Sequence, residues 1–228
     1  MPIVLLGLWA CSNSSEAFLQ KGRELMKAGK FEEALPFLNQ AIEKNTQNAE
    51  AFNARGVAYF SLKEYQNALL DYNRAIELDK NNYKSYNNRA ILKAAMNNPQ
   101  AALADYDQAI RLKADTNELY TNRGYLHFQL KNYDKALQDF DKALSLYPKD
   151  KEALFNRGSI YYEQKKYDKA LSDFQAVVRI DSKLAKAFYA LALVELALQE
   201  RENACIHLRQ AEKLGYTSAQ EAIGLYCQ

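Results

Sequence analysis

A six-residue motif occurs three times along the chain at a fixed spacing. Asp-Tyr-Asn-Arg-Ala-Ile at residues 71–76 is followed by Asp-Tyr-Asp-Gln-Ala-Ile at 105–110 and by Asp-Phe-Asp-Lys-Ala-Leu at 139–144, and both steps are 34 residues long. Periods of about 20 to 50 residues are typical of chains that stack one small structural unit many times. The chain is therefore expected to fold as an array in which each unit buries its apolar face against its neighbours.

The same period divides most of the chain without a gap. Starting at Ser15, it gives six repeats of 34 residues, 15–48, 49–82, 83–116, 117–150, 151–184 and 185–218, followed by a tail, 219–228. Positions within a repeat are numbered from 1 to 34, so that residues at one position of different repeats form a column.

The columns predict two amphipathic helices in each repeat. Position 8 is small throughout (Gly22, Gly56, Ala90, Gly124, Gly158, Ala192), position 20 is alanine in all six repeats, and position 24 is bulky (Leu38, Tyr72, Tyr106, Phe140, Phe174, Leu208). Spacings of three and four residues keep the apolar positions of a helix on one side of it. Small residues opposite large ones let two antiparallel helices approach closely.

This pattern of columns resembles the tetratricopeptide repeat (TPR) family over residues 15–218. The resemblance implies an all-α fold, a right-handed superhelical solenoid of six helix-turn-helix repeats, with the tail 219–228 as a short C-terminal capping helix. It also implies that the first helices of the repeats line a concave groove, in which a protein or peptide partner binds.

Composition and motifs argue against other classes of function. Lys and Arg number 30 and Asp and Glu 28, and a formal net charge of +2 gives no basis for nucleic-acid binding. Three cysteines and two histidines are too few for a spaced zinc cluster. The sequence also lacks a Ser/His/Asp or Cys/His arrangement and a phosphate-binding loop. We therefore expect no enzyme, no cofactor, no metal and no small-molecule substrate.

Two polar columns change together along the chain. Position 7 is Arg and position 23 is Asp in the second to fifth repeats, whereas the first and sixth repeats lack both residues. Position 7 lies on the side of the first helix that faces its own second helix, so four ion pairs within repeats are expected rather than a basic stripe for a ligand. The pairs are Arg55–Asp71, Arg89–Asp105, Arg123–Asp139 and Arg157–Asp173.

Asparagine and aromatic residues gather on the face of the first helices that is turned away from this packing. The asparagines are Asn88, Asn122 and Asn156 at position 6 and Asn53 and Asn87 at position 5, and the rings are Tyr125, Phe128, Phe155, Tyr162 and Tyr189. A carboxamide both donates and accepts hydrogen bonds, so it can hold a peptide backbone of any sequence. In the alternative interpretation the asparagines are only solvated, and the rings pack between adjacent first helices.

The N-terminal segment suggests a location. Residues 1–10 are almost all apolar, and Leu8-Trp9-Ala10-Cys11 resembles a bacterial lipoprotein box, which implies lipidation of Cys11 and removal of the preceding residues. Residues 1–11 would then be a signal segment ending in Cys11, and 12–14 a polar spacer. The protein would sit at the bacterial cell envelope and meet the membrane only through the lipid. Alternatively, the segment packs on the first repeat.

The two remaining cysteines lie near the C-terminus. Cys205 replaces the leucine of the same column in the other repeats, so it is expected to be a small buried hydrophobe, and a disulfide with Cys227 stays open. The favoured function is a non-enzymatic scaffold that holds a partner in the groove at an envelope membrane. The alternatives are a cytoplasmic adaptor without an anchor and an envelope assembly factor that binds folded partners by its convex face or its ends.

Overall fold

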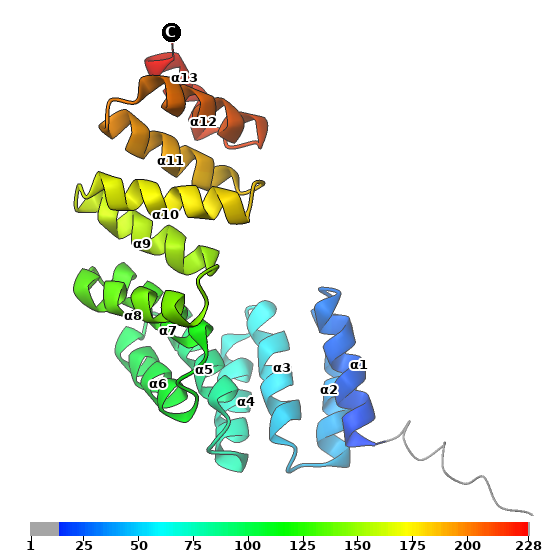
Figure 1. Ribbon diagram of the computed structural model, residues 1–228. Coiled ribbons are helices and arrows are strands. Elements are labelled where there is room, and N and C mark those ends of the chain that lie inside the picture. Colours follow the sequence, from blue (N-terminus) through cyan, green and yellow to red (C-terminus); the bar gives the residue numbers. More distant parts are fainter. Residues whose placement is uncertain (1–13, 228) are drawn as a thin grey trace, which may run out of the picture. The chain divides into compact units, whose positions relative to one another are not determined.

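The computed structural model describes residues 14–227, and its secondary structure in that range consists of thirteen α-helices (Figure 1). Twelve of them form six pairs, one pair in each 34-residue repeat. The pairs are α1 (Ser15–Lys27) and α2 (Phe31–Lys44), α3 (Ala49–Ser61) and α4 (Tyr65–Leu78), α5 (Tyr83–Ala95) and α6 (Pro99–Leu112), α7 (Asn117–Gln129) and α8 (Tyr133–Leu146), α9 (Lys151–Glu163) and α10 (Tyr167–Ile180), and α11 (Ala185–Ala197) and α12 (Arg201–Lys213). The short helix α13 (Ser218–Tyr226) follows, so the predicted all-α repeat architecture with a C-terminal helix is confirmed. Cys11 lies outside the described residues.

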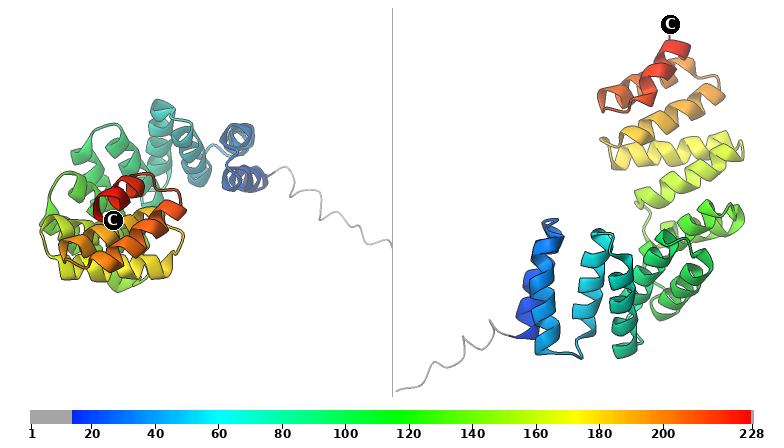
Figure 2. Two further views of the ribbon diagram at one scale, coloured as in Figure 1. Left: turned by 90° about the horizontal axis from the view of Figure 1, so that it is seen from above. Right: turned by 180° about the vertical axis from the view of Figure 1, so that it is seen from behind.

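The chain divides into two compact units, unit 1 ending at Ala114 and unit 2 beginning at Asp115. Unit 1 holds α1–α6 and unit 2 holds α7–α13. Inside each unit the second helix of a repeat packs against the first helix of the next, and neighbouring first helices also touch. Seen from above, α1 and α2 stand end-on and side by side (Figure 2). Each unit is therefore a short stack of helix pairs.

The two helices of every repeat are joined by the same tight turn. The residue at position 15 has a positive φ in all six repeats: Gly29 (75°), Lys63 (63°), Asn97 (58°), Lys131 (59°), Lys165 (58°) and Gln199 (66°). A left-handed backbone costs a residue with a side chain about 1–2 kcal/mol. The five repeats without glycine at this position have this cost, and the direct packing of the two helices that the turn allows offsets it.

Polar residues just before the first helices fix where those helices begin. Asn48 is the N-cap of α3, and its Oδ1 accepts from the backbone N–H of Ala51 at 3.0 Å. Its Nδ2 donates to Oγ of Ser15 at 2.9 Å, at the start of α1. One side chain thus caps a helix and also ties it to the preceding repeat, as expected for an N-cap asparagine that has a donor left over.

The small and bulky columns meet inside each repeat as the pattern predicts. A Cβ added to Gly56 would lie 2.6 Å from Cε1 of Tyr72, and one added to Gly124 would lie 2.9 Å from Cε1 of Phe140. Tyr72 is 1% exposed and Phe140 is fully buried. In the repeats with glycine at position 8 and a ring at position 24, the absence of a side chain on the first helix lets the ring of the second helix lie against its backbone.

The interpretation of Cys205 as a buried hydrophobe is wrong. Cys205, on α12, is half-buried and forms a disulfide with Cys227, which follows α13. The two Cα atoms are 5.6 Å apart, a separation that is typical of disulfides. The column could not show this, because Cys227 belongs to the tail, which lies outside the six aligned repeats.

Candidate functional site

The four arginines at position 7 each lie beside the aspartate of their own repeat. Their Nε and Nη2 atoms donate to the two carboxylate oxygens at 2.6–2.9 Å, in the pairs Arg55–Asp71, Arg89–Asp105, Arg123–Asp139 and Arg157–Asp173. The aspartate side chains are only 6–8% exposed. The hydrogen bonds to Asp71 raise the pKa of Arg55, which keeps the guanidinium group charged. These guanidinium groups are engaged in forked pairs inside the fold and do not form a surface for a ligand.

The remaining arm of the guanidinium reaches the preceding repeat, a contact that the sequence analysis missed. Nη1 donates to Asn39 from Arg55 at 2.8 Å, to Asn73 from Arg89 at 2.8 Å, and to Asp141 from Arg157 at 2.6 Å. The acceptors all occupy position 25 of the preceding second helix. Each of these three arginines therefore binds both helices of its own repeat to the neighbouring one.

The sixth repeat has a different polar pair, in which His207 takes position 23 in place of the aspartate. Nδ1 of His207, on α12, lies 2.7 Å from Oε2 of Glu195 on α11. Glu195 is 2% exposed, so this hydrogen bond satisfies a buried carboxyl group. The sequence columns did not reveal it, because Glu195 stands at position 11 and not at position 7.

The predicted asparagines of unit 1 bond to one another. Nδ2 of Asn88, on α5, donates to Oδ1 of Asn53 on α3 at 3.0 Å. Nδ2 of Asn87 lies 3.5 Å from Oδ1 of Asn88. In this unit the amides link two adjacent first helices, so part of their hydrogen-bonding capacity is already used.

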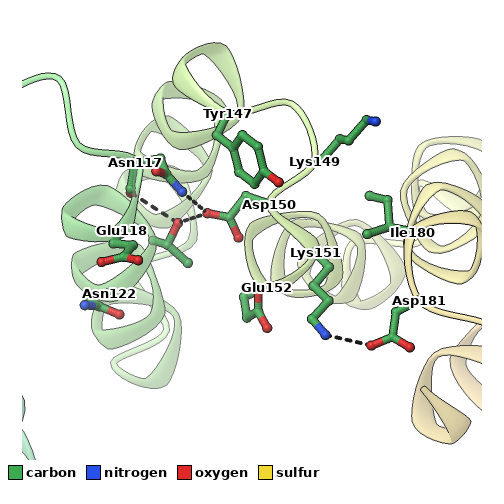
Figure 3. Close-up of a pocket in the computed structure, with 11 residues that line it drawn as sticks. Asn117, Glu118, Asn122, Tyr147, Lys149, Asp150, Lys151, Glu152, Ile180 and Asp181 are labelled. Carbon is green, nitrogen blue, oxygen red and sulfur yellow. Dashed lines mark hydrogen bonds and ion pairs between the residues drawn. The ribbon is translucent and has the colours of Figure 1, made fainter. Parts of the chain in front are cut away.

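Unit 2 places Asn122 in a pocket between α7 and α9, here called the α7–α9 pocket (Figure 3). It has a volume of about 550 Å³. Its walls are Asn117, Glu118, Thr121, Asn122, Tyr147, Lys149, Asp150, Lys151, Glu152, Ile180 and Asp181. Tyr147 is 50% exposed and Ile180 39% exposed, so the pocket offers apolar surface beside polar groups. This combination is typical of sites that bind a ligand of mixed polarity.

Asp150 is the residue that builds this pocket. It is the N-cap of α9, and its Oδ1 accepts from the backbone N–H of Ala153 at 3.0 Å. Its Oδ2 accepts from Nδ2 of Asn117 at 2.8 Å and from Oγ1 of Thr121 at 2.7 Å, both on α7 (Figure 3). The carboxylate is buried, and these donors satisfy it. As Asn48 does in unit 1, it sets the spacing of two first helices.

An ion pair lies at the side of the pocket towards α11. Nζ of Lys151 is 2.6 Å from Oδ2 of Asp181 (Figure 3). The hydrogen bond from Lys151 lowers the pKa of the Asp181 carboxyl group, and the same contact raises the pKa of the Lys151 ammonium group. Glu118 and Glu152 add two exposed carboxylates to the walls. This pocket was not predicted from the sequence. The signal that could have found it is the polar residue at position 34, just before the next first helix, in the first four repeats.

A second, smaller pocket of about 100 Å³ holds Asn156 and lies between α9 and α11. Phe155 and Lys186 also line this α9–α11 pocket, and Nζ of Lys186 lies 4.4 Å from the centroid of the Phe155 ring. An ammonium over an aromatic face is attracted to it. Lys151 and Glu152 line both pockets, so the two hollows adjoin.

Most of the predicted groove rings pack on other rings of unit 2. The centroid distances are 5.4 Å for Phe155–Phe174, 6.0 Å for Phe128–Tyr133, 5.7 Å for Tyr162–Tyr167 and 4.9 Å for Tyr189–Tyr216. Burial raises the pKa of Tyr162. Tyr125 is 46% exposed. Four of the five rings thus pack on another ring, but these ring partners lie on second helices or, for Tyr216, between α12 and α13. They do not lie on the adjacent first helix, as the alternative interpretation had it.

Two kinds of site are not found among residues 14–227. No three His, Cys, Asp or Glu side chains gather there in a way that could hold a metal ion. None of the helices in this range is long and apolar enough to cross a bilayer. In unit 2, two adjoining pockets lie along the first helices α7, α9 and α11.

Sequence models of the tetratricopeptide repeat match residues 19–83, 83–116, 118–150 and 152–184. The matched segments cover most of the chain and follow the helix pairs. The chain belongs to the tetratricopeptide repeat family. TPR proteins are generally non-enzymatic and bind protein or peptide partners, so this TPR chain is a scaffold for protein–protein interaction. No curated protein sequence matches it.

Solved structures of other TPR proteins have the same fold. YrrB, described as a TPR protein with an unusual peptide-binding site, is 26% identical, with 81% of this chain and 96% of YrrB aligned at a TM-score of 0.64. PilW, described as a type IV pilus biogenesis factor, is 18% identical. The alignment covers 92% of this chain and 97% of PilW at a TM-score of 0.82. A chain of the APC/C hetero-tetramer Cut9–Hcn1 is 19% identical at a TM-score of 0.82. The alignment covers 95% of this chain but only 43% of that longer chain.

Proposed function

We propose that unit 2 of this TPR scaffold binds an extended segment of a partner protein along α7, α9 and α11. The observation that carries the proposal is the pair of adjoining pockets, each of which holds an asparagine from position 6, Asn122 in one and Asn156 in the other. Carboxamides one repeat apart suit a ligand that presents polar groups at intervals, as a peptide backbone does. The likeness to YrrB, which has a peptide-binding site, supports this class of ligand.

The size of the expected interactions decides which groups must take part. A neutral hydrogen bond contributes about 1 kcal/mol net, and a micromolar complex needs about 8 kcal/mol. Two asparagines are therefore insufficient alone. The apolar surfaces of Tyr147, Ile180 and Phe155 would supply the rest, because burying an apolar side chain contributes roughly 1.5–3 kcal/mol. The partner segment then needs apolar side chains between its polar groups.

Replacing Asn122 and Asn156 together by alanine is expected to weaken this binding by roughly 1–3 kcal/mol, since both amides lose their hydrogen bonds to the peptide. Peptides selected from a random library on the parent protein serve as the ligand, and calorimetric titration measures the dissociation constant. The thermal unfolding midpoint should stay within a few degrees of the parent, because both asparagines are only half-buried.

Two exposed residues on second helices provide the matched control. Gln138 on α8 and Ser172 on α10 occupy position 22 of the same two repeats, and their joint replacement by alanine should leave binding unchanged. If this control variant lost binding while the asparagine variant kept it, the second helices α8 and α10 would form the binding face. That result would favour the assembly-factor alternative.

We further propose that the protein is anchored at a bacterial cell envelope by a lipid on Cys11. The apolar segment that ends at Cys11 supports this, and so does the Cys205–Cys227 disulfide, because disulfides persist in oxidising compartments outside the cytosol. The competing location is the cytoplasm, for an adaptor that carries no anchor.

Intact-mass analysis and fractionation of the natively expressed protein test the anchor. The protein should fractionate with membranes and carry the added mass of a lipid, whereas Cys11→Ser should appear in the soluble fraction or remain unprocessed. The matched variant Ser12→Ala should behave like the parent. An unmodified Cys11 in the mature protein would contradict the anchor and would leave the peptide-binding proposal untouched.

A further inference from the structure

The disulfide holds the end of the last helix of unit 2. Cys205 and Cys227 are 22 residues apart, and Cys227 directly follows α13. Cys205 stands at position 21, where the five earlier repeats have Leu35, Leu69, Leu103, Leu137 and Leu171. A covalent bond thus replaces the apolar contact that this column makes elsewhere.

Helix α13 covers the apolar end of the array but has little stability of its own. Ala219 and Ala222 of α13 lie in one cluster with Ala192, Leu208 and Ala211 of the sixth repeat. A nine-residue helix is well below the length at which an isolated helix is stable in water. It therefore depends on this packing and on the disulfide at its far end.

The disulfide is open to reagents in solution. A hollow of about 500 Å³ is lined by both half-buried cysteines together with Arg201, Arg209, Glu202 and Ile206. Ile206 is 62% exposed, so no other part of unit 2 covers the hollow there. Two guanidinium groups outnumber the one carboxylate in its walls, and neighbouring cations favour the thiolate form of a sulfur atom.

We propose that the Cys205–Cys227 disulfide is a site of thiol–disulfide exchange, at which a dithiol reductant releases α13. One thiolate of the reductant attacks a protein sulfur and forms a mixed disulfide, while the other protein sulfur leaves as a thiolate. The second thiolate of the reductant then attacks the reductant's other sulfur in the mixed disulfide, and the protein sulfur leaves as a thiolate. The reductant leaves as a disulfide, and two electrons and two protons have passed to the two cysteines.

Reduction of the disulfide thus removes the covalent link to one end of α13, the helix that covers the sixth repeat. Without the bond, the C-terminal end of α13 is held by its small apolar contacts and by the hydrogen bond that Nε of Arg201 donates to the backbone carbonyl of Tyr226. When this end opens, the surfaces of Leu208 and Ala211 that it covers become reachable. This inference does not depend on the peptide-binding proposal, because it concerns the end of unit 2 and not the pockets between its first helices.

The experiment compares the oxidised full chain with the same chain in dithiothreitol without denaturant. Alkylation followed by peptide mapping should show that Cys205 and Cys227 become free thiols under these native conditions. Amide exchange in residues 218–226 should then rise on the order of a hundredfold, the gain expected when a loop of this length loses its cross-link, while exchange in α7–α10 should not change.

Two variants separate the bond from the packing around it. Cys205→Ser/Cys227→Ser should exchange like the reduced parent and be insensitive to dithiothreitol. Cys205→Leu restores the side chain of the other repeats, and it should slow exchange in α13 relative to the serine variant if an apolar contact substitutes for the bond. The proposal would be overturned if the disulfide were reduced only in denaturant, or if its native reduction left exchange in α13 unchanged.

Discussion

The Arg55→Ala variant is expected to lose about 3–5 kcal/mol of the free energy of unfolding of unit 1, because it leaves the buried Asp71 carboxylate without its partner. The Asp71 side chain is 6% exposed, and Arg55 supplies both charged hydrogen bonds that reach it, at 2.8 Å each. The substitution also removes the donor to Asn39. Urea denaturation followed by circular dichroism measures the change, and an unaltered slope would show that the folded state is preserved.

Arg89→Ala is the matched comparison and should cost less. Asp105, the partner of Arg89, also receives a hydrogen bond from Nζ of Lys93 at 2.7 Å, so its carboxylate keeps one cation after the substitution. Arg74→Ala removes only an exposed pair with Glu77 and should cost about 0–1 kcal/mol. Equal losses for Arg55→Ala and Arg74→Ala would mean that burial of the aspartate contributes nothing to the effect.

The Phe140→Ala variant is expected to lose about 3–5 kcal/mol of the free energy of unfolding of unit 2. Phe140 is fully buried, and its ring lies where a Cβ on Gly124 would be only 2.9 Å away. Glycine has no side chain that could move into the space left by the ring, so a cavity remains. Thermal and urea denaturation of the full chain measure the loss.

Phe140→Leu provides the control for size at the same position. Leucine stands there in the first repeat, where Leu38 packs against Gly22, so this substitution should cost less than about 1.5 kcal/mol. If Phe140→Ala and Phe140→Leu were equally mild, the close packing of ring against backbone would not be a main source of stability.

The helix pairs could be predicted from the sequence because their causes lie close together along the chain. Small residues at position 8 and bulky ones at position 24 belong to one repeat, and the helix propensities and caps that set the ends act within a few residues. The Arg–Asp pairs follow for the same reason, since position 7 and position 23 lie on the facing sides of one helix pair.

What the sequence did not reveal depends on how neighbouring repeats meet. The bonds from Arg55 to Asn39 and from Arg157 to Asp141 require the packing of one repeat on the next, and their acceptors differ in chemistry. The α7–α9 pocket arises from Asp150, whose two roles become visible only when α7 and α9 are side by side. The bond between Cys205 and Cys227 depends on the approach of a tail that follows no repeat pattern.

The arginines that reach back to the preceding repeat affect how unit 1 should come apart. Arg55 and Arg89 each hold a neighbour through Asn39 or Asn73, so a repeat that unfolds deprives the next arginine of an acceptor and loosens its hold on its own aspartate. In a linear array the energies of such interfaces determine how far a local opening spreads. Melting that begins at one end should therefore run through the whole unit as a single transition, and fraying repeat by repeat should appear only when Asn39 and Asn73 are both replaced by alanine.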